Sequence, residues 1–201
     1  MNNTKGYLCL FAAILIQLFN GVFFLWANIS VYVLSYIYIY DKNVNADAVY
    51  YVDMAATFLT LAGYQIGAYL INERQWNPKC ILALGGSIAF TGIFAASFTT
   101  NLTTFVILYG ACAGIGCGIN YLIPFVCVWK YFPENKGLVS GIVSGAYGMG
   151  NLIFSYLSTS LVNPNDATAT IYITDDLRYF EEDVAEKVPQ MLRKLCSIWI
   201  V

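Results

Sequence analysis

The stretch Gly110-Ala-Cys-Ala-Gly114-Ile-Gly-Cys-Gly118 lies in an uncharged apolar segment that runs from about Leu102 to Val128. A bilayer-crossing helix needs about 20 apolar residues, and this segment is long enough. Gly110, Gly114 and Gly118 are spaced so that they fall on one helix face. Small residues at this spacing let a neighbouring membrane helix approach closely. The stretch therefore predicts a membrane-spanning helix that packs tightly against another one.

Four further segments have the same apolar character. They run from about Tyr7 to Tyr40, from about Ala48 to Ile71, from about Cys80 to Phe98 and from about Leu138 to Val162. In chain order, the second segment repeats the glycine spacing with Gly63 and Gly67, and the fifth repeats it with Gly137, Gly141 and Gly145. We expect close packing there by the same means.

A sixth apolar segment begins near Val188 and reaches Val201. It is too short to cross a bilayer, and a half-span leaves backbone groups unsatisfied in hydrocarbon. We therefore expect the sequence to stop inside a sixth helix, as in a fragment or a truncated gene product. The preceding stretch, 163–187, is acidic and is expected outside the membrane.

The composition excludes several classes of function. Hydrophobic residues make up 59% of the chain and charged residues 11%, whereas a soluble domain has roughly 25% charged residues. The chain has no histidine, its six cysteines form no C-x-x-C pair, and its net charge is -2. We expect no enzyme activity, because no nucleophile–base pair is visible, and no metal, cofactor or nucleic-acid partner. The expected partners are the lipid bilayer and a small-molecule solute.

The basic residues of the short connections are distributed unequally. If the N-terminus is cytoplasmic, the cytoplasmic side holds Lys5, Arg74, Lys79, Lys130 and Lys136. The short outer connections then hold only Lys42. Because basic residues favour the cytoplasmic side, the sequence predicts a multi-pass protein with its N-terminus inside.

Polar residues recur within the apolar segments, where an unpartnered amide or hydroxyl is costly. On the first helix they follow one stripe, which also includes Phe24. The whole set is Gln17, Asn20, Asn28, Tyr32, Gln65, Asn120, Tyr121, Tyr147 and Asn151. Two interpretations stay open: the amides bond to neighbouring helices, or the set lines a shared water-accessible cavity.

Asp53 is the only carboxylate inside an apolar segment. It is a candidate proton-coupling group, because burial disfavours the charged form of an acid. The alternative is that it lies near the start of its helix and is stabilised by the helix dipole and interfacial water.

Three runs together resemble the major facilitator superfamily, and most of all its oxalate/formate antiporter and monocarboxylate transporter-like branch. They are Gly114-Ile-Gly-Cys-Gly-Ile-Asn-Tyr-Leu-Ile-Pro124, Trp129-Lys-Tyr-Phe-Pro-Glu-Asn-Lys-Gly137 and Gly141-Ile-Val-Ser-Gly-Ala-Tyr-Gly-Met-Gly150. The resemblance implies an all-α membrane bundle, the N-terminal six-helix half of a twelve-helix transporter. Its two inverted three-helix repeats would be residues 1–100 and 101–201.

The resemblance also assigns residues to two cytoplasmic loops. These are Arg74, Asn77, Pro78, Lys79, Phe132, Pro133, Lys136 and Gly137. Asn77 stands where the family has a glycine, and asparagine can take the left-handed conformation that the glycine would supply. The branch often has tyrosine where this chain has Phe24, and the usual acidic residue of the loop before Pro78 is displaced or replaced.

By resemblance, the complete protein would move a small organic anion such as a monocarboxylate by alternating access, as an antiporter or a symporter. Hydroxyls of Tyr32, Tyr121 and Tyr147 would bind the substrate, and Asn20, Asn28 and Asn120 would orient it. Phe24 and Trp26 would form the cavity wall. In this branch the C-terminal half, missing from this chain, supplies basic residues that pair with substrate carboxylates. The alternatives are a truncated non-transporting scaffold or subunit, and a homodimer that builds the pathway from two copies.

Overall fold

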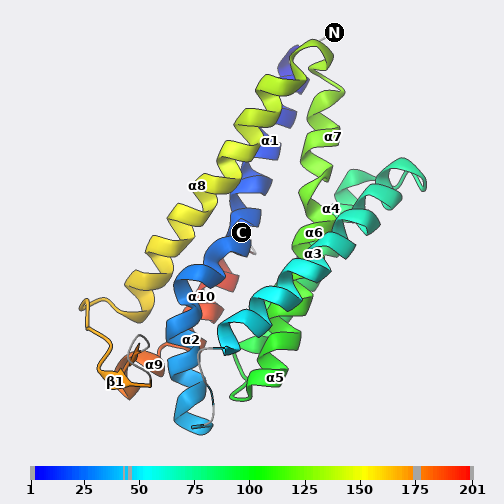
Figure 1. The fold of residues 1–201 in the computed structure, drawn as a ribbon. Coiled ribbons are helices and arrows are strands. Elements are labelled where there is room, and N and C mark those ends of the chain that lie inside the picture. The colour runs from blue at the N-terminus through cyan, green and yellow to red at the C-terminus, as the bar shows by residue number, and fades with distance from the viewer. Residues whose placement is uncertain (1–2, 43, 45–46, 174–177, 200–201) are drawn as a thin grey trace.

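The computed structural model describes residues 3–42, 44, 47–173 and 178–199. Within them, five helical runs are long and apolar enough to cross a membrane: Thr4–Tyr40, Ala48–Asn72, Pro78–Ala96, Leu102–Trp129 and Pro133–Val162. These runs confirm the five predicted segments and the all-α membrane bundle (Figure 1). The protein is therefore an integral, multi-pass membrane protein.

Two of the five runs are interrupted. The first consists of α1 (Asn3–Asn20), a 3₁₀ turn η1 (Gly21–Leu25) and α2 (Trp26–Tyr40). The second and third are single helices, α3 (Ala48–Asn72) and α4 (Pro78–Ala96). The fourth consists of α5 (Leu102–Phe105), a π-helix η2 (Val106–Cys112), α6 (Ala113–Tyr121) and α7 (Ile123–Trp129). The fifth is α8 (Lys136–Val162), preceded by the turn η3 (Pro133–Asn135).

The remaining elements follow α8. Strands β1 (Ile171–Tyr172) and β2 (Arg178–Tyr179) pair antiparallel, and the short helix α9 (Glu182–Ala185) follows them. Helix α10 (Val188–Trp199) then packs against α4 and α8. Its Arg193 donates hydrogen bonds to the hydroxyl of Ser97 at 3.2 Å and to the Ser97 carbonyl at 3.3 Å. Arg193 thus satisfies a carbonyl group just beyond the end of α4, where helix carbonyls lack partners.

The predicted close packing at the glycine face of α6 is confirmed. A Cβ at Gly114 would overlap the carbonyl oxygen of Ala56 in α3, and a Cβ at Gly118 would lie 2.9 Å from the Cα of Gly63. Gly67 meets the backbone of Ile119 in the same way. Backbones of α3 and α6 therefore touch directly, which a side chain on either face would prevent.

The same prediction for the fifth segment is wrong within the described part of the chain. A Cβ at Gly137, Gly141 or Gly145 would meet nothing within 4 Å. The physical reason is that α8 approaches α1 through a different face. Gly150 lies against the Leu18 carbonyl, and Gly21 lies against the backbone of α8.

Asn77 does not use the left-handed conformation that is available to it. Asn77 has φ −61° and ψ 125°, and its side chain accepts a hydrogen bond from the Lys79 N–H at 3.0 Å. It therefore caps the start of α4, a role that requires an extended backbone. The left-handed residue of this turn is Gln75, with φ 51°.

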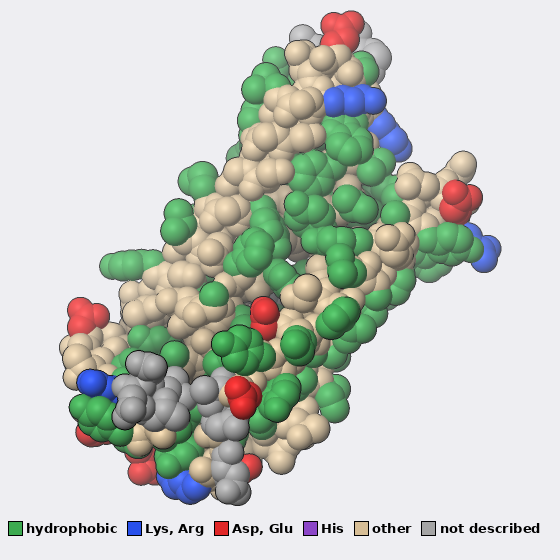
Figure 2. Space-filling model, in the orientation of Figure 1, with side chains coloured by type: hydrophobic (Ala, Val, Ile, Leu, Met, Phe, Trp, Pro, Cys, Tyr) green, Lys and Arg blue, Asp and Glu red, His purple; other side chains and the backbone are tan. Residues whose placement is uncertain are grey.

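Large apolar side chains cover much of the outer surface. Phe58 is 69% exposed, Leu152 71% and Tyr156 79%. In Figure 2 apolar side chains spread over the shaft of the molecule, while most charged side chains lie towards its ends. Such a surface matches a lipid environment around the shaft and water at both ends.

Candidate functional site

Four aromatic side chains from different elements meet between α3, α6, α8 and η1. We call Phe24, Tyr64, Tyr121 and Tyr147 the tyrosine cluster. The ring centroids of Tyr121 and Tyr147 are 5.4 Å apart, and those of Tyr147 and Phe24 are 5.2 Å apart. Tyr64 lies 5.1 Å from Tyr121. These spacings are typical of directly packed aromatic pairs.

The hydroxyls of the cluster are available to a ligand. Tyr64, Tyr121 and Tyr147 are half-buried, and Phe24 is 50% exposed. None of the three hydroxyls has a hydrogen-bond partner among the described residues. Each can donate one hydrogen bond, and an acceptor on a ligand would satisfy it.

Two local features of the sequence position the cluster. Gly21 lets α8 come close to the first helix, because a Cβ there would overlap the Tyr147 carbonyl. This contact places Tyr147 beside Phe24. Tyr121 is the last residue of α6, where the helix is interrupted ahead of Pro124. Proline has no N–H and interrupts the helical hydrogen bonds, so a break is expected there.

Several predicted amides have protein partners. Gln17 is fully buried and donates to the Tyr121 carbonyl at 3.3 Å, and Asn20 donates to the Gln17 side chain at 2.9 Å. With its amide oriented to satisfy its neighbours, Asn120 donates to two carbonyls of α4 and accepts from the Gly86 N–H at 3.0 Å. These bonds join α1 to α6 and α6 to α4. They agree with the helix-bonding interpretation of Gln17 and Asn120, whose place in the pathway stays a prediction.

Asn28 joins α2 to α8. Its amide nitrogen lies 3.2 Å from the Ser155 carbonyl, 3.3 Å from the Ser158 hydroxyl and 3.0 Å from the Thr159 hydroxyl. One turn away on α8, Asn151 accepts a hydrogen bond from the Ser155 hydroxyl at 3.3 Å.

Three predicted residues lie apart from the tyrosine cluster. Trp26 is buried, donates its indole N–H to the Val49 carbonyl at 3.1 Å and packs against η2. Tyr32 stacks on Phe180, the residue that follows β2, with ring centroids 4.5 Å apart. Gln65 is exposed and has no hydrogen-bond partner among the described residues.

Tyr64 is the cluster member that sequence reasoning missed. The available signal was Gly63, which comes directly before it. Gly63 lies against the Gly118 backbone, so α3 and α6 touch at this level. The next residue on α3 then meets Tyr121, which is three residues beyond Gly118.

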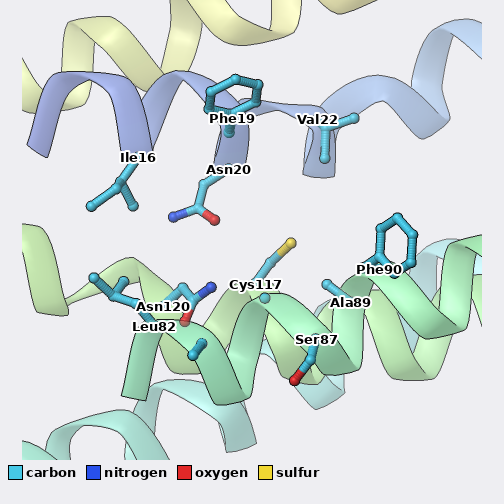
Figure 3. Close-up of a pocket in the computed structure, with 12 residues that line it drawn as sticks. Ile16, Phe19, Asn20, Val22, Leu82, Ser87, Ala89, Phe90, Cys117 and Asn120 are labelled. Carbon is cyan, nitrogen blue, oxygen red and sulfur yellow. The ribbon is translucent and has the colours of Figure 1, made fainter. Parts of the chain in front are cut away.

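A separate cavity of about 380 Å³ lies between α1, α4 and α6. Figure 3 shows Asn20 pointing into it from α1, with Asn120 and Cys117 opposite on α6. Most of its other lining side chains are apolar, including Phe19, Leu82 and Phe90 in the described chain. None of the tyrosine cluster lines it.

The predicted loop residues lie at the end of the bundle where α1 begins (Figure 1). Arg74 donates to the Tyr69 hydroxyl at 2.8 Å beyond α3, and Asn77, Pro78 and Lys79 start α4. Phe132, beside Pro133 at the turn before Lys136 and Gly137, packs on Tyr7 with ring centroids 5.8 Å apart. Within the described chain, no group of three His, Cys, Asp or Glu side chains is arranged to hold a metal ion.

The fold defines a multi-pass membrane protein, and the proteins that it matches are transporters and not enzymes. No family model matches the chain. It is 27% identical over 192 residues to apicoplast pyruvate carrier 1 of Toxoplasma gondii, covering 79% of this chain and 35% of that protein. It is 33% identical over 90 residues to monocarboxylate transporter 12 of Xenopus laevis, covering 45% and 19%.

A third match is the oxalate:formate antiporter of Oxalobacter formigenes, with 29% identity over 108 residues, 54% of this chain and 25% of that protein. The chain thus spans about a third or less of the length of these relatives. The curated matches are transporters of the major facilitator type, which confirms the resemblance drawn from the sequence.

Proposed function

We propose that the protein transports a small organic anion, most simply a monocarboxylate, across a membrane by alternating access. The observation that carries the proposal is the tyrosine cluster, with three hydroxyl donors that have no partner in the described chain. The relatives support the substrate class, because their names specify pyruvate, monocarboxylates, oxalate and formate.

The chemistry of the cluster suits such a ligand. Hydroxyl donors stabilise a carboxylate by about 1.5–3 kcal/mol for each hydrogen bond to the charged group. The faces of the aromatic rings accommodate the short apolar part of a monocarboxylate. No Lys or Arg occurs in the sequence of the runs 6–40, 48–72, 80–96, 102–129 or 137–162. Binding by neutral donors is weak enough to permit release, and further protein surface would supply the counter-charge.

The cluster also connects the two proposed three-helix repeats. Tyr64 comes from the first repeat, residues 1–100, and Tyr121 and Tyr147 come from the second, residues 101–201. Rocking of helices against one another changes the separation of these hydroxyls, as alternating access requires. We propose a cytoplasmic N-terminus, and a pathway closed by a second six-helix half or by a second copy of the chain.

Uptake by proteoliposomes tests the proposal. Labelled pyruvate, formate and oxalate are offered to the wild type and to the Tyr121→Phe and Tyr147→Phe variants. Each variant loses one donor and keeps its ring, so its KM should rise about tenfold or more. Tyr156→Phe is the matched control on α8, because that side chain is 79% exposed and outside the cluster. Unchanged uptake in both cluster variants would count against the site.

A further inference from the structure

The cavity of about 380 Å³ between α1, α4 and α6 has room for a ligand, because ligand pockets usually measure about 300–1,000 Å³. Its lining in the described chain is mostly apolar and includes no charged residue. The candidate proton-coupling residue Asp53 is exposed in the second turn of α3 and does not line it. An anion would lose its hydration there without gaining a counter-charge. The cavity therefore suits a neutral ligand, unlike the tyrosine cluster.

One side chain in the cavity has a polar atom without a partner. Asn20 is 8% exposed and points into the cavity from α1 (Figure 3). Its amide nitrogen donates to the Gln17 side-chain oxygen at 2.9 Å, and the Gln17 nitrogen donates to the Tyr121 carbonyl at 3.3 Å. Because a carbonyl can only accept, these two bonds fix the orientation of both amides. The Asn20 oxygen is therefore left facing the cavity, and it accepts no hydrogen bond from the described residues.

The other polar side chains of the lining are less available to a ligand. Asn120, in the orientation that satisfies it, bonds to two carbonyls of α4 and to the Gly86 N–H. The Ser87 hydroxyl donates to the Leu84 carbonyl at 3.0 Å. A cysteine thiol, as at Cys117, is only a weak donor and acceptor. A buried acceptor without a donor costs free energy, so a ligand that donates one hydrogen bond would be favoured at the Asn20 oxygen.

The cavity opens on the outer surface of two membrane-spanning runs. Helices α1 and α4 both belong to the runs that are apolar enough to cross a bilayer. Among the lining residues, Phe19 is 37% exposed, and Ala83 and Ser87 are also exposed. A molecule dissolved in the bilayer can therefore enter from the side, between α1 and α4.

We propose that this cavity binds a neutral amphiphile of the bilayer that carries a hydroxyl group, such as a long-chain alcohol or an acylglycerol. Its hydroxyl donates to the Asn20 side-chain oxygen, and its alkyl chain lies against the apolar walls formed by Phe19, Leu82 and Phe90. The bound molecule bridges α1 and α4. Because it is neutral and lies outside the tyrosine cluster, this site does not depend on the proposed anion transport.

Photoaffinity labelling in nanodiscs of phosphatidylcholine, a lipid without a hydrogen-bond donor, tests the site. One probe is dodecanol with a diazirine in its chain, and the other is its methyl ether, which has the same body and no donor. Mass spectrometry locates the labelled residues. In the wild type the alcohol should label residues 16–22 and 82–90. Its half-saturating mole fraction should be about fivefold lower than that of the ether, the effect of one ordinary hydrogen bond.

Two variants distinguish the acceptor from the space. Asn20→Leu keeps a side chain of similar size and should remove the difference between the two probes. Gly86→Leu should abolish labelling by both probes, because a Cβ there meets only Asn120, at 3.7 Å, and the longer side chain fills the cavity. Gly145→Leu is the matched control, the same change at an open position of α8, and should be labelled like the wild type.

Equal half-saturation of the two probes in the wild type would overturn the proposed hydrogen bond to Asn20. Labelling that is spread evenly over the lipid-facing helices, or that persists in Gly86→Leu, would overturn the site itself. The even spread is the result expected if a further helix or a second copy of the chain covers the cavity. None of these results bears on the uptake of anions, so the failure of this site and the failure of the proposed function are distinguishable.

Discussion

At the scale of single residues, Asn28 shows how one amide holds two membrane helices together. Its nitrogen has two hydrogens and three acceptors within 3.3 Å, all of them on α8. In lipid no water replaces these bonds when they are lost. The contact between α2 and α8 therefore depends strongly on this side chain.

Asn28→Ala should destabilise the protein by about 1–3 kcal/mol, because acceptors on α8 lose their donor. The measurement is the thermal unfolding midpoint in detergent. Asn165→Ala, at an exposed loop position, is the control. An Asn28→Ala protein that unfolds at the wild-type temperature would show that the bond network contributes nothing.

Tyr179 gives a prediction for pH dependence. Its side chain is fully buried and its hydroxyl has no partner in the described chain. Burial, followed by the neighbouring Tyr38, raises the pKa of Tyr179 to about 12, above the ordinary tyrosine pKa of about 10. The folded protein therefore favours the neutral hydroxyl of Tyr179 over the charged phenolate. The part of the folding stability that depends on a neutral Tyr179 is complete below about pH 10 and is lost as the pH rises through about 12.

Tyr179→Phe should keep the ring contact with Tyr38 and remove this loss at high pH. Because an unsatisfied buried hydroxyl costs about 1–3 kcal/mol, the variant should also be more stable at neutral pH. Amide hydrogen exchange of residues 171–173 and 178–180 measures both effects. Slower exchange in the wild type than in Tyr179→Phe at neutral pH would contradict the prediction.

At the scale of elements, the same substitution of valine for glycine should have different effects at Gly114 of α6 and at Gly141 of α8. Gly114→Val should lower stability by about 3 kcal/mol, because its side chain would overlap the backbone of α3. Gly141→Val should have little effect, because the space beside Gly141 is open in the described chain. Both changes carry the same cost in helix propensity. Folded yield and unfolding temperature in detergent would distinguish the two variants. An equal loss of stability in Gly114→Val and Gly141→Val would refute the packing argument.

Elements differ in how far the sequence predicts them. Length and hydrophobicity predicted all five bilayer-crossing runs, because lipid imposes one helix length on every segment. The π-helix η2 was not predicted, since a wider turn has no separate signal in an apolar run. The open face of Gly141 was also missed, because spacing specifies a face but not the neighbour that it meets. Two members of the tyrosine cluster, Tyr121 and Tyr147, were selected for polarity within a span, whereas Tyr64 needed the observed contact between α3 and α6.

At the scale of the whole molecule, the two ends of the bundle offer a test of the proposed membrane orientation. Cys80 is exposed and lies in the first turn of α4, at the end where α1 begins. With a cytoplasmic N-terminus, a membrane-impermeant maleimide should label Cys80 in inside-out vesicles and leave it unlabelled in right-side-out vesicles. A cysteine introduced by Asn165→Cys, beyond α8, should show the opposite pattern. Labelling of Cys80 from the outside would reverse the orientation.

The unequal lengths of the helices make the molecule sensitive to bilayer thickness. Helix α8 has 27 residues and α4 has 19, which correspond to lengths of about 40 Å and about 28 Å. A hydrocarbon core of about 30 Å fits α4 upright, whereas α8 must tilt or extend beyond it. Longer lipid chains favour a more upright α8 and shorter ones a greater tilt. Because α8 carries Tyr147, the acyl-chain length of the surrounding lipids should act as a mechanical control on the spacing of the tyrosine hydroxyls.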